Sequence, residues 1–139
     1  MKFIVLFVTI VALITISNAE IEGASDETKE YFGNIRKTCM EKTDVDEATI
    51  DKANEGDFDD GNDKFKCYAY CVMRELKTMD ENGGIHYEPM MEYLPEDYKE
   101  PVKEMFEACD NFTDDDLCMR AYNVFKCNAE KYPEYFFVV

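Results

Sequence analysis

Six cysteines are the residues of this chain whose type and spacing suit a covalent chemistry, the formation of disulfides. An even number of cysteines in a short chain that begins with a secretion signal predicts three bridges formed in an oxidising compartment. Fifteen pairings are possible, and the spacing alone does not choose among them. Cys67 and Cys71 are one helical turn apart, so we expect them to hold two different neighbouring helices. The six are Cys39, Cys67, Cys71, Cys109, Cys118 and Cys127.

The other residues that could carry chemistry do not form a recognisable catalytic or metal-binding motif. His86 is the only histidine, and no serine or cysteine around it belongs to a nucleophile motif. One histidine and six bridged cysteines do not make a zinc site. The acidic run 57–63 is not a calcium loop, because Asn62 stands in the place of the required glycine and Tyr68 in the place of the bidentate glutamate. We expect no enzyme activity, no metal and no cofactor, and interpret the run as a turn followed by a helix cap.

Residues 1–19 have the layout of a secretory signal peptide. Lys2 supplies a positive start, residues 3–16 are almost uninterruptedly apolar, and small residues close the segment at 17–19. The apolar run is shorter than the roughly 20 residues of a membrane span, although a retained membrane anchor is the alternative. We therefore expect a secreted, extracellular protein with one domain, residues 20–139.

The composition is strongly acidic, with 31 Asp and Glu against 15 Lys and Arg and a net charge of −16. An acidic surface repels the phosphates of nucleic acid and anionic membranes, so we expect neither as a partner. We interpret the charge as a shell that keeps the protein soluble.

Apolar residues recur at steps of three and four without strand alternation, which predicts an all-α domain of six helices. The clearest pattern covers 63–79, and Gly83-Gly84 breaks the chain after it. The apolar segment 132–139 is expected to fold back onto the helices. Asn111 opens a formal glycosylation sequon in a loop beside two cysteines. Five other helices are expected. One starts near Ser25, a second covers 46–54, and a third carries Tyr87, Met90 and Leu94. The fourth covers 97–110, and the last starts at Thr113 or Asp114.

The cysteine spacing C-x27-C-x3-C-x37-C-x8-C-x8-C resembles the signature of the insect odorant-binding protein family. Further stretches that are similar to the family are Lys66-Cys67-Tyr68, Cys71-Val72-Met73, 80–86, Leu94-Pro95 and the closing 135–139. The last of these is similar to the subgroup whose C-terminus forms a wall of the ligand pocket. The resemblance covers the whole of residues 20–139.

The resemblance implies a six-helix, disulfide-stapled bundle around a central hydrophobic cavity. Its bridges would be Cys39–Cys71, Cys67–Cys118 and Cys109–Cys127. Flexible methionines in the wall would adapt to several ligands. Asn128 stands where relatives have a large aromatic residue, so we expect Asn128, Tyr122 or a backbone group of the tail to give the ligand a polar contact. The implied ligand-binding residues are Val72, Met73, Leu76, Tyr87, Met90, Leu94, Val102, Met105, Phe106, Phe125, Phe136 and Phe137.

The resemblance also implies a latch at the C-terminus. In the similar subgroup, groups on the first and third helices hold the terminal carboxylate, and the matching positions are Arg36 and Tyr68, which would grip Val139. Arginine stays charged, so only the carboxylate titrates, and the latch should loosen at a lower pH than a histidine latch would. The alternative is that Arg36 is simply an exposed residue of an amphipathic helix.

The function implied is that of a secreted carrier that binds hydrophobic volatiles, odorants or pheromones, and delivers them to chemosensory receptors. A membrane odorant receptor and a second copy in a homodimer are further candidate partners. The same fold as a scavenger or transporter in a non-sensory secretion is the first alternative. A secreted effector that acts through its surface is the second alternative, and it would need no cavity.

Overall fold

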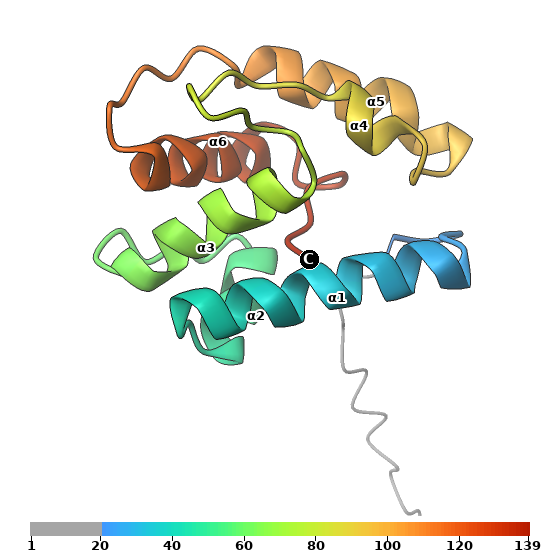
Figure 1. The fold of residues 1–139 in the computed structure, drawn as a ribbon. Coiled ribbons are helices and arrows are strands. Elements are labelled where there is room, and N and C mark those ends of the chain that lie inside the picture. The colour runs from blue at the N-terminus through green and yellow to red at the C-terminus, as the bar shows by residue number, and fades with distance from the viewer. Residues whose placement is uncertain (1–20) are drawn as a thin grey trace, which may run out of the picture.

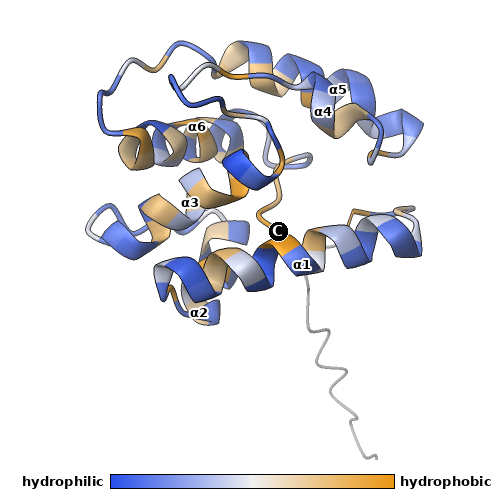
Figure 2. Ribbon diagram, viewed as in Figure 1, coloured by the Kyte–Doolittle hydropathy of each residue, from blue (hydrophilic) through white to orange (hydrophobic). Residues whose placement is uncertain are grey.

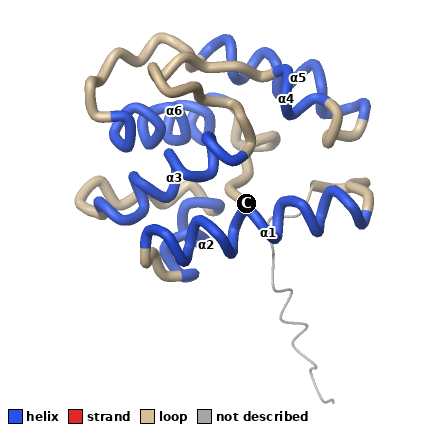
Figure 3. The backbone as a smooth tube through the Cα atoms, in the orientation of Figure 1, coloured by secondary structure: helices blue, strands red, loops and turns tan. Residues whose placement is uncertain are grey.

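The computed structural model describes residues 21–139, and the expected signal peptide lies outside them. Apart from one isolated antiparallel bridge between Met79 and Ile85, the described chain is helix and loop (Figures 1 and 3). The all-α prediction is confirmed. The helices are α1 (Asp26–Thr43), α2 (Glu47–Asn54), α3 (Asp63–Glu75), α4 (Glu88–Met91), α5 (Glu96–Ala108) and α6 (Leu117–Lys131).

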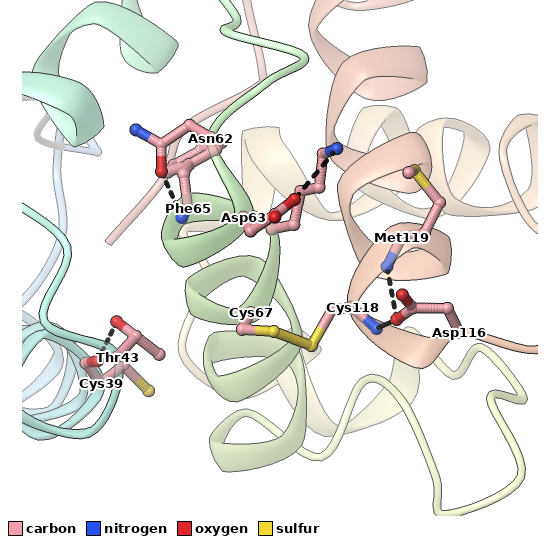
Figure 4. The surroundings of a disulfide bond; sticks show 10 residues. Cys39, Thr43, Asn62, Asp63, Phe65, Cys67, Asp116, Cys118 and Met119 are labelled. Atoms are coloured by element: carbon pink, nitrogen blue, oxygen red, sulfur yellow. Dashed lines mark hydrogen bonds and ion pairs between the residues drawn. A yellow bond between two sulfur atoms is a disulfide. The ribbon is translucent and has the colours of Figure 1, made fainter.

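Side-chain caps determine where four of these helices begin. Ser25, Asp46, Asn62 and Asp116 each accept a hydrogen bond from a backbone N–H in the first turn of α1, α2, α3 and α6. Such caps pair N–H groups that have no partner within the helix. The acidic run 57–63 therefore leads into the helix cap that the sequence predicted, as Figure 4 shows for Asn62.

The start of α6 is a correction, because Asp116 is the cap in place of Thr113 or Asp114. Asp114 instead accepts hydrogen bonds from two side chains of α6. Its carbonyl accepts from Arg120 Nε at 2.8 Å, and its carboxylate accepts from Asn123 at 3.0 Å. The segment before Asp116 thus packs along α6 as a loop.

The end of α3 is also earlier than the sequence predicts. The apolar pattern continues to Met79, but Lys77 takes a left-handed backbone conformation (φ 59°) that ends the helix after Glu75. The N–H of Thr78 then bonds to the carbonyl of Met73 at 2.8 Å. This turn keeps Thr78 and Met79 buried inside the domain.

Three disulfides join the helices, and the pairing implied by the resemblance is confirmed. Cys67 and Cys71 connect α3 to two different helices, α6 and α1, and Figure 4 shows the first of these bridges, Cys67–Cys118. The third bridge ties the end of α5 to α6. The pairs are Cys39–Cys71, Cys67–Cys118 and Cys109–Cys127.

The hydrophobic interior lies around α3, which packs against α6 on one side and α1 on the other. The tail after α6 turns back into the middle of the molecule, where Figure 1 marks the C-terminus. Val138 and Val139 are buried there, and Figure 2 shows the tail in the colours of apolar residues. Within residues 21–139, no helix has both the length and the apolar character needed to cross a bilayer.

Removing the Cys67–Cys118 bridge should lower the free energy of unfolding more than removing Cys109–Cys127. The two bridges close segments of 51 and 18 residues, for which chain entropy gives roughly 4 and 3 kcal/mol. Urea unfolding of the two double-alanine variants measures the difference. A larger loss for the shorter segment would show that packing, and not chain entropy, decides the contribution of each bridge.

Candidate ligand-binding cavity

An inner cavity of about 30 Å³ lies between α3, α4, α5, α6 and the tail. Its wall is almost entirely apolar, which suits a ligand with few polar atoms. Most of the residues expected to bind ligand are on this wall. They are Val72, Met73, Leu76, Met90, Met105, Phe106, Phe125, Phe136 and Phe137.

Tyr87, Leu94 and Val102 were expected on the wall and lie elsewhere. Leu94 and Val102 are buried in the solid part of the core. Tyr87 is half-buried just before α4, with the ammonium of Lys103 5.9 Å from the centre of its ring. An apolar stripe identifies the inward side of a helix, but it does not distinguish residues at a void from residues in close packing.

The cavity is small for the ligands that the family resemblance implies. A volume of 30 Å³ holds about two water molecules. A ligand of ten or more carbons must therefore displace side chains. Met73, Met90 and Met105 are on the wall, and methionine adapts its shape at little cost.

Two polar residues interrupt the apolar wall, Thr78 and Asn128. The hydroxyl of Thr78 donates to the carbonyl of Met73 at 3.2 Å. Asn128 is only 3% exposed, and its Oδ1 has no hydrogen-bond partner. Thr78 was missed from the sequence, because its place on the wall depends on the turn at Lys77 that ends α3 early.

Tyr122 does not offer its proton to the cavity, which corrects its expected role as a donor to ligand. Its hydroxyl donates to Asp60 Oδ1 at 2.5 Å, and Lys126 Nζ binds the same oxygen at 2.9 Å. Burial, together with the hydrogen bond to Asp60, raises the pKa of Tyr122. The hydroxyl therefore stays protonated and ties α6 to the loop before α3.

A second pocket of about 190 Å³ lies between α1, α2 and the other side of the tail. Ile21 and Phe32 contribute apolar surface to it, and charged residues of α1 and α2 complete the wall. Phe137 and Val139 line both this outer pocket and the inner cavity. The tail is thus the partition between the two spaces.

The tail is held by two side chains. Asn54, the last residue of α2, accepts from the N–H of Val138 at 2.6 Å and donates to its carbonyl at 3.0 Å. The hydroxyl of Tyr68 donates to an oxygen of Val139. Asn54 was not found from the sequence, because an asparagine at the end of a short helix carries no signal of a partner 84 residues away.

Arg36 lies on the wall of the outer pocket beside Val139. Its guanidinium pairs with Glu47 at 3.3 Å and Asp51 at 3.1 Å, which ties α1 to α2. Burial raises the pKa of the Tyr68 hydroxyl, and the charge of Arg36 partly opposes that rise. The arginine of the expected latch is therefore near the tail, with its ion pairs directed to α2.

His86 is hydrogen-bonded to Asp80 in the loop after α3. Its Nε2 lies 2.8 Å from Asp80, and this bond, with the N–H groups of Gly84 and Asn82, lowers the pKa of Asp80 to about 2. The stabilisation from Asp80 is complete above its unfolded pKa of about 3.9 and is lost only as pH falls through about 2. The Asp80 carboxylate therefore remains ionised throughout pH 5–7, and its contribution to stability does not change in that range.

The cross-linked helices, the apolar inner cavity and the tail that closes it define the class: a helical binding domain for small hydrophobic molecules. Residues 22–131 match the PBP/GOBP family, and the chain belongs to that family. This confirms the resemblance that the cysteine spacing indicated.

Individual relatives are distant in sequence and close in fold. General odorant-binding protein 69a of Drosophila melanogaster is 26% identical over 93 residues, which are 67% of this chain and 63% of that protein. Odorant-binding protein 22 of Aedes aegypti is 24% identical over 123 residues, 87% of this chain and 86% of that protein. The crystal structure of odorant binding protein 4 of Chrysopa pallens has a TM-score of 0.71 and 30% identity, and the match covers 81% of this chain and 96% of that chain.

Substituting Asn54 by Ala should release the tail locally. The N–H of Val138 would lose its side-chain acceptor, so its hydrogen exchange should accelerate by about tenfold or more. NMR-detected exchange of that amide is the measurement. Asn54→Asp keeps an acceptor and should restore part of the protection, whereas Asn34→Ala, on the exposed face of α1, should change nothing. Unchanged exchange in Asn54→Ala would show that packing alone holds the tail.

Proposed function

We propose that this protein is a secreted carrier of small hydrophobic molecules, odorants or pheromones foremost, and that it has no catalytic activity. The observation that carries the proposal is an apolar inner cavity with the chain's own tail as one wall, in a member of the PBP/GOBP family. Related proteins that share the fold are named odorant-binding proteins. Secretion is supported by the signal-peptide pattern of residues 1–19.

The affinity follows from how much apolar surface such a ligand buries. Burying about 300 Å² at roughly 25 cal/mol per Å² contributes about 7–8 kcal/mol. Association entropy and the displacement of wall side chains offset a large part of this gain. The carrier should therefore bind with micromolar affinity and accept several chain lengths.

Entry and release would proceed through the tail. Moving Phe137 and Val139 aside joins the inner cavity to the outer pocket, because both residues line both spaces. Asn54 and Tyr68 hold the tail from outside the cavity. Arg36 would add attraction to the carboxylate of Val139, which completes the latch that the resemblance implies.

Delivery to a membrane odorant receptor, and association into a homodimer, belong to the same proposal. The alternative that retains the cavity is a scavenger or transporter of hydrophobic molecules in a non-sensory secretion. The tissue of expression separates these two uses. A surface-acting effector would require no ligand cavity, and so a binding measurement separates it from both.

Residues 20–139 with the disulfides formed should bind a hydrophobic fluorescent probe at one saturable site. Several volatile alcohols, esters and terpenoids should displace the probe at micromolar concentrations. Fluorescence titration and competition make the measurement, and circular dichroism confirms that the sample is helical. A correctly folded sample that binds neither probe nor volatiles would refute the carrier function and favour the effector.

Ligand affinity should be constant from pH 7.5 to 5.5 and fall as the pH approaches about 4. The Tyr68 hydroxyl stays protonated because burial raises its pKa, so the carboxylate of Val139 is the member of this pair that titrates. A carboxylate supports the docked tail above its pKa and loses that support as pH falls through it.

The measurement is the competition assay repeated across this pH range. His86→Asn is the matched control, and its profile should coincide with that of the parent protein. A fall between pH 7 and 5.5 that the control abolishes would assign release to the histidine and overturn the latch.

A further inference from the structure

One unpaired polar atom in the cavity indicates which chemical group the ligand carries. Asn128 is 3% exposed and lines the inner cavity. Among the described residues, its Oδ1 is the buried side-chain oxygen or nitrogen that lacks a hydrogen-bond partner. We propose that this oxygen is the polar subsite of the ligand and selects molecules that bear a hydroxyl, such as aliphatic alcohols. The inference rests on the proposed carrier function.

An unpaired buried amide oxygen is a feature that folding alone does not favour. Burying it without a donor destabilises the folded state, and an apolar residue of similar size would avoid that loss. The side chains of its apolar neighbours on the wall, among them Phe125, Met105 and Phe136, carry no donor. A molecule inside the cavity can supply the missing proton.

Thr78 is the other polar side chain on the wall, and its proton is already committed. Its hydroxyl donates to the carbonyl of Met73, which leaves only lone pairs toward other partners. Thr78 therefore cannot donate a hydrogen bond to Asn128 Oδ1, and both side-chain oxygens can accept one from a ligand.

An alcohol fits this requirement better than the other common head groups. Esters, ethers and aldehydes accept hydrogen bonds without donating, and would leave Oδ1 unpaired. An ionised carboxylate has no proton to give, and an ammonium or a carboxylate brings a charge that the apolar wall would have to desolvate. A hydroxyl supplies one proton and remains neutral.

The dimensions of the cavity agree with a head group that is seated here while the chain displaces side chains of the wall. The existing volume of about 30 Å³ holds about two water-sized groups. An alkyl chain needs more room, and Phe136 and Phe137 are half-buried tail residues that line the same space. The hydroxyl thus occupies space that is already present, whereas the alkyl chain opens additional space by displacing side chains.

The test compares 1-dodecanol with its methyl ether, which has nearly the same apolar surface but no proton to donate. In the competition assay at pH 7, the parent protein should bind the alcohol about tenfold tighter, the factor expected for one net hydrogen bond. Asn128→Leu should remove this preference by weakening the alcohol about tenfold, with the ether unchanged or slightly improved. Laurate, ionised at this pH, should bind more weakly than the alcohol.

Phe125→Leu is the matched control, because Phe125 lies on the same helix and the same wall. It should weaken alcohol and ether alike and leave their ratio intact. Without ligand, Asn128→Leu should melt at the same temperature as the parent or higher, because the unpaired oxygen is gone. A variant that melts several degrees lower and loses both ligands equally would mark Asn128 as structural and overturn the inference.

The parent protein alone also decides the question if Asn128→Leu does not fold. Equal affinities for alcohol and ether, or tighter binding of laurate, would overturn the hydroxyl subsite and leave the carrier function standing. Failure of all three ligands and of the probe to bind would instead refute the carrier function itself.

Discussion

The two disulfides that join α3 to α6 and to α1 are the constraint on which the rest of the structure depends. Cys67 ties the helix to α6 and Cys71 ties it to α1. A small domain that keeps its interior partly empty loses contacts that a filled core would provide. Cross-links that restrict the unfolded chain offset that loss without filling the space. The cavity residues Val72 and Met73 follow directly after Cys71, so the bridge also positions the wall.

The tail is a structural part of the core and the movable part of the binding site at once. Its last two residues are buried, and Phe137 and Val139 separate the inner cavity from the outer pocket. The groups that hold it, Asn54 and Tyr68, belong to α2 and α3. A ligand that enters or leaves would have to part these hydrogen bonds, which lie outside the cavity, and their re-formation after entry would close the tail behind it. Tail docking would therefore help to retain a bound ligand.

The sequence predicted the features that depend on neighbouring residues and missed those that depend on segments far apart in the chain. The helical period shows which side of α3 and α6 faces inward, and short-range caps such as Asn62 depend on neighbours in sequence, so both were predictable. Whether an inward residue borders a void depends on all the surrounding helices, which is why Val102 was placed on the wall and lies in the solid core. The pairing of Asn54 with Val138 and of Tyr122 with Asp60 joins distant segments, and no local pattern carries it. The cysteine pairing came from the family resemblance, since the spacing alone did not choose among the possible pairings.

A cavity with a deformable apolar wall and one fixed polar atom recognises the two ends of a ligand through different interactions, apolar burial for the chain and a hydrogen bond for the head group. The apolar contribution grows gradually with each methylene buried, and methionines and a movable tail absorb differences in length, so the chain is selected only broadly. A hydrogen bond to a buried group is either made or left unmade, and the penalty for leaving it unmade does not diminish with chain length. Asn128 sits on α6, which the Cys67–Cys118 bridge fixes to α3, whereas the tail opposite it is held by only a few hydrogen bonds. The rigid side of the cavity is thus the side suited to distinguish head groups, and the yielding side is the one suited to accept different chains.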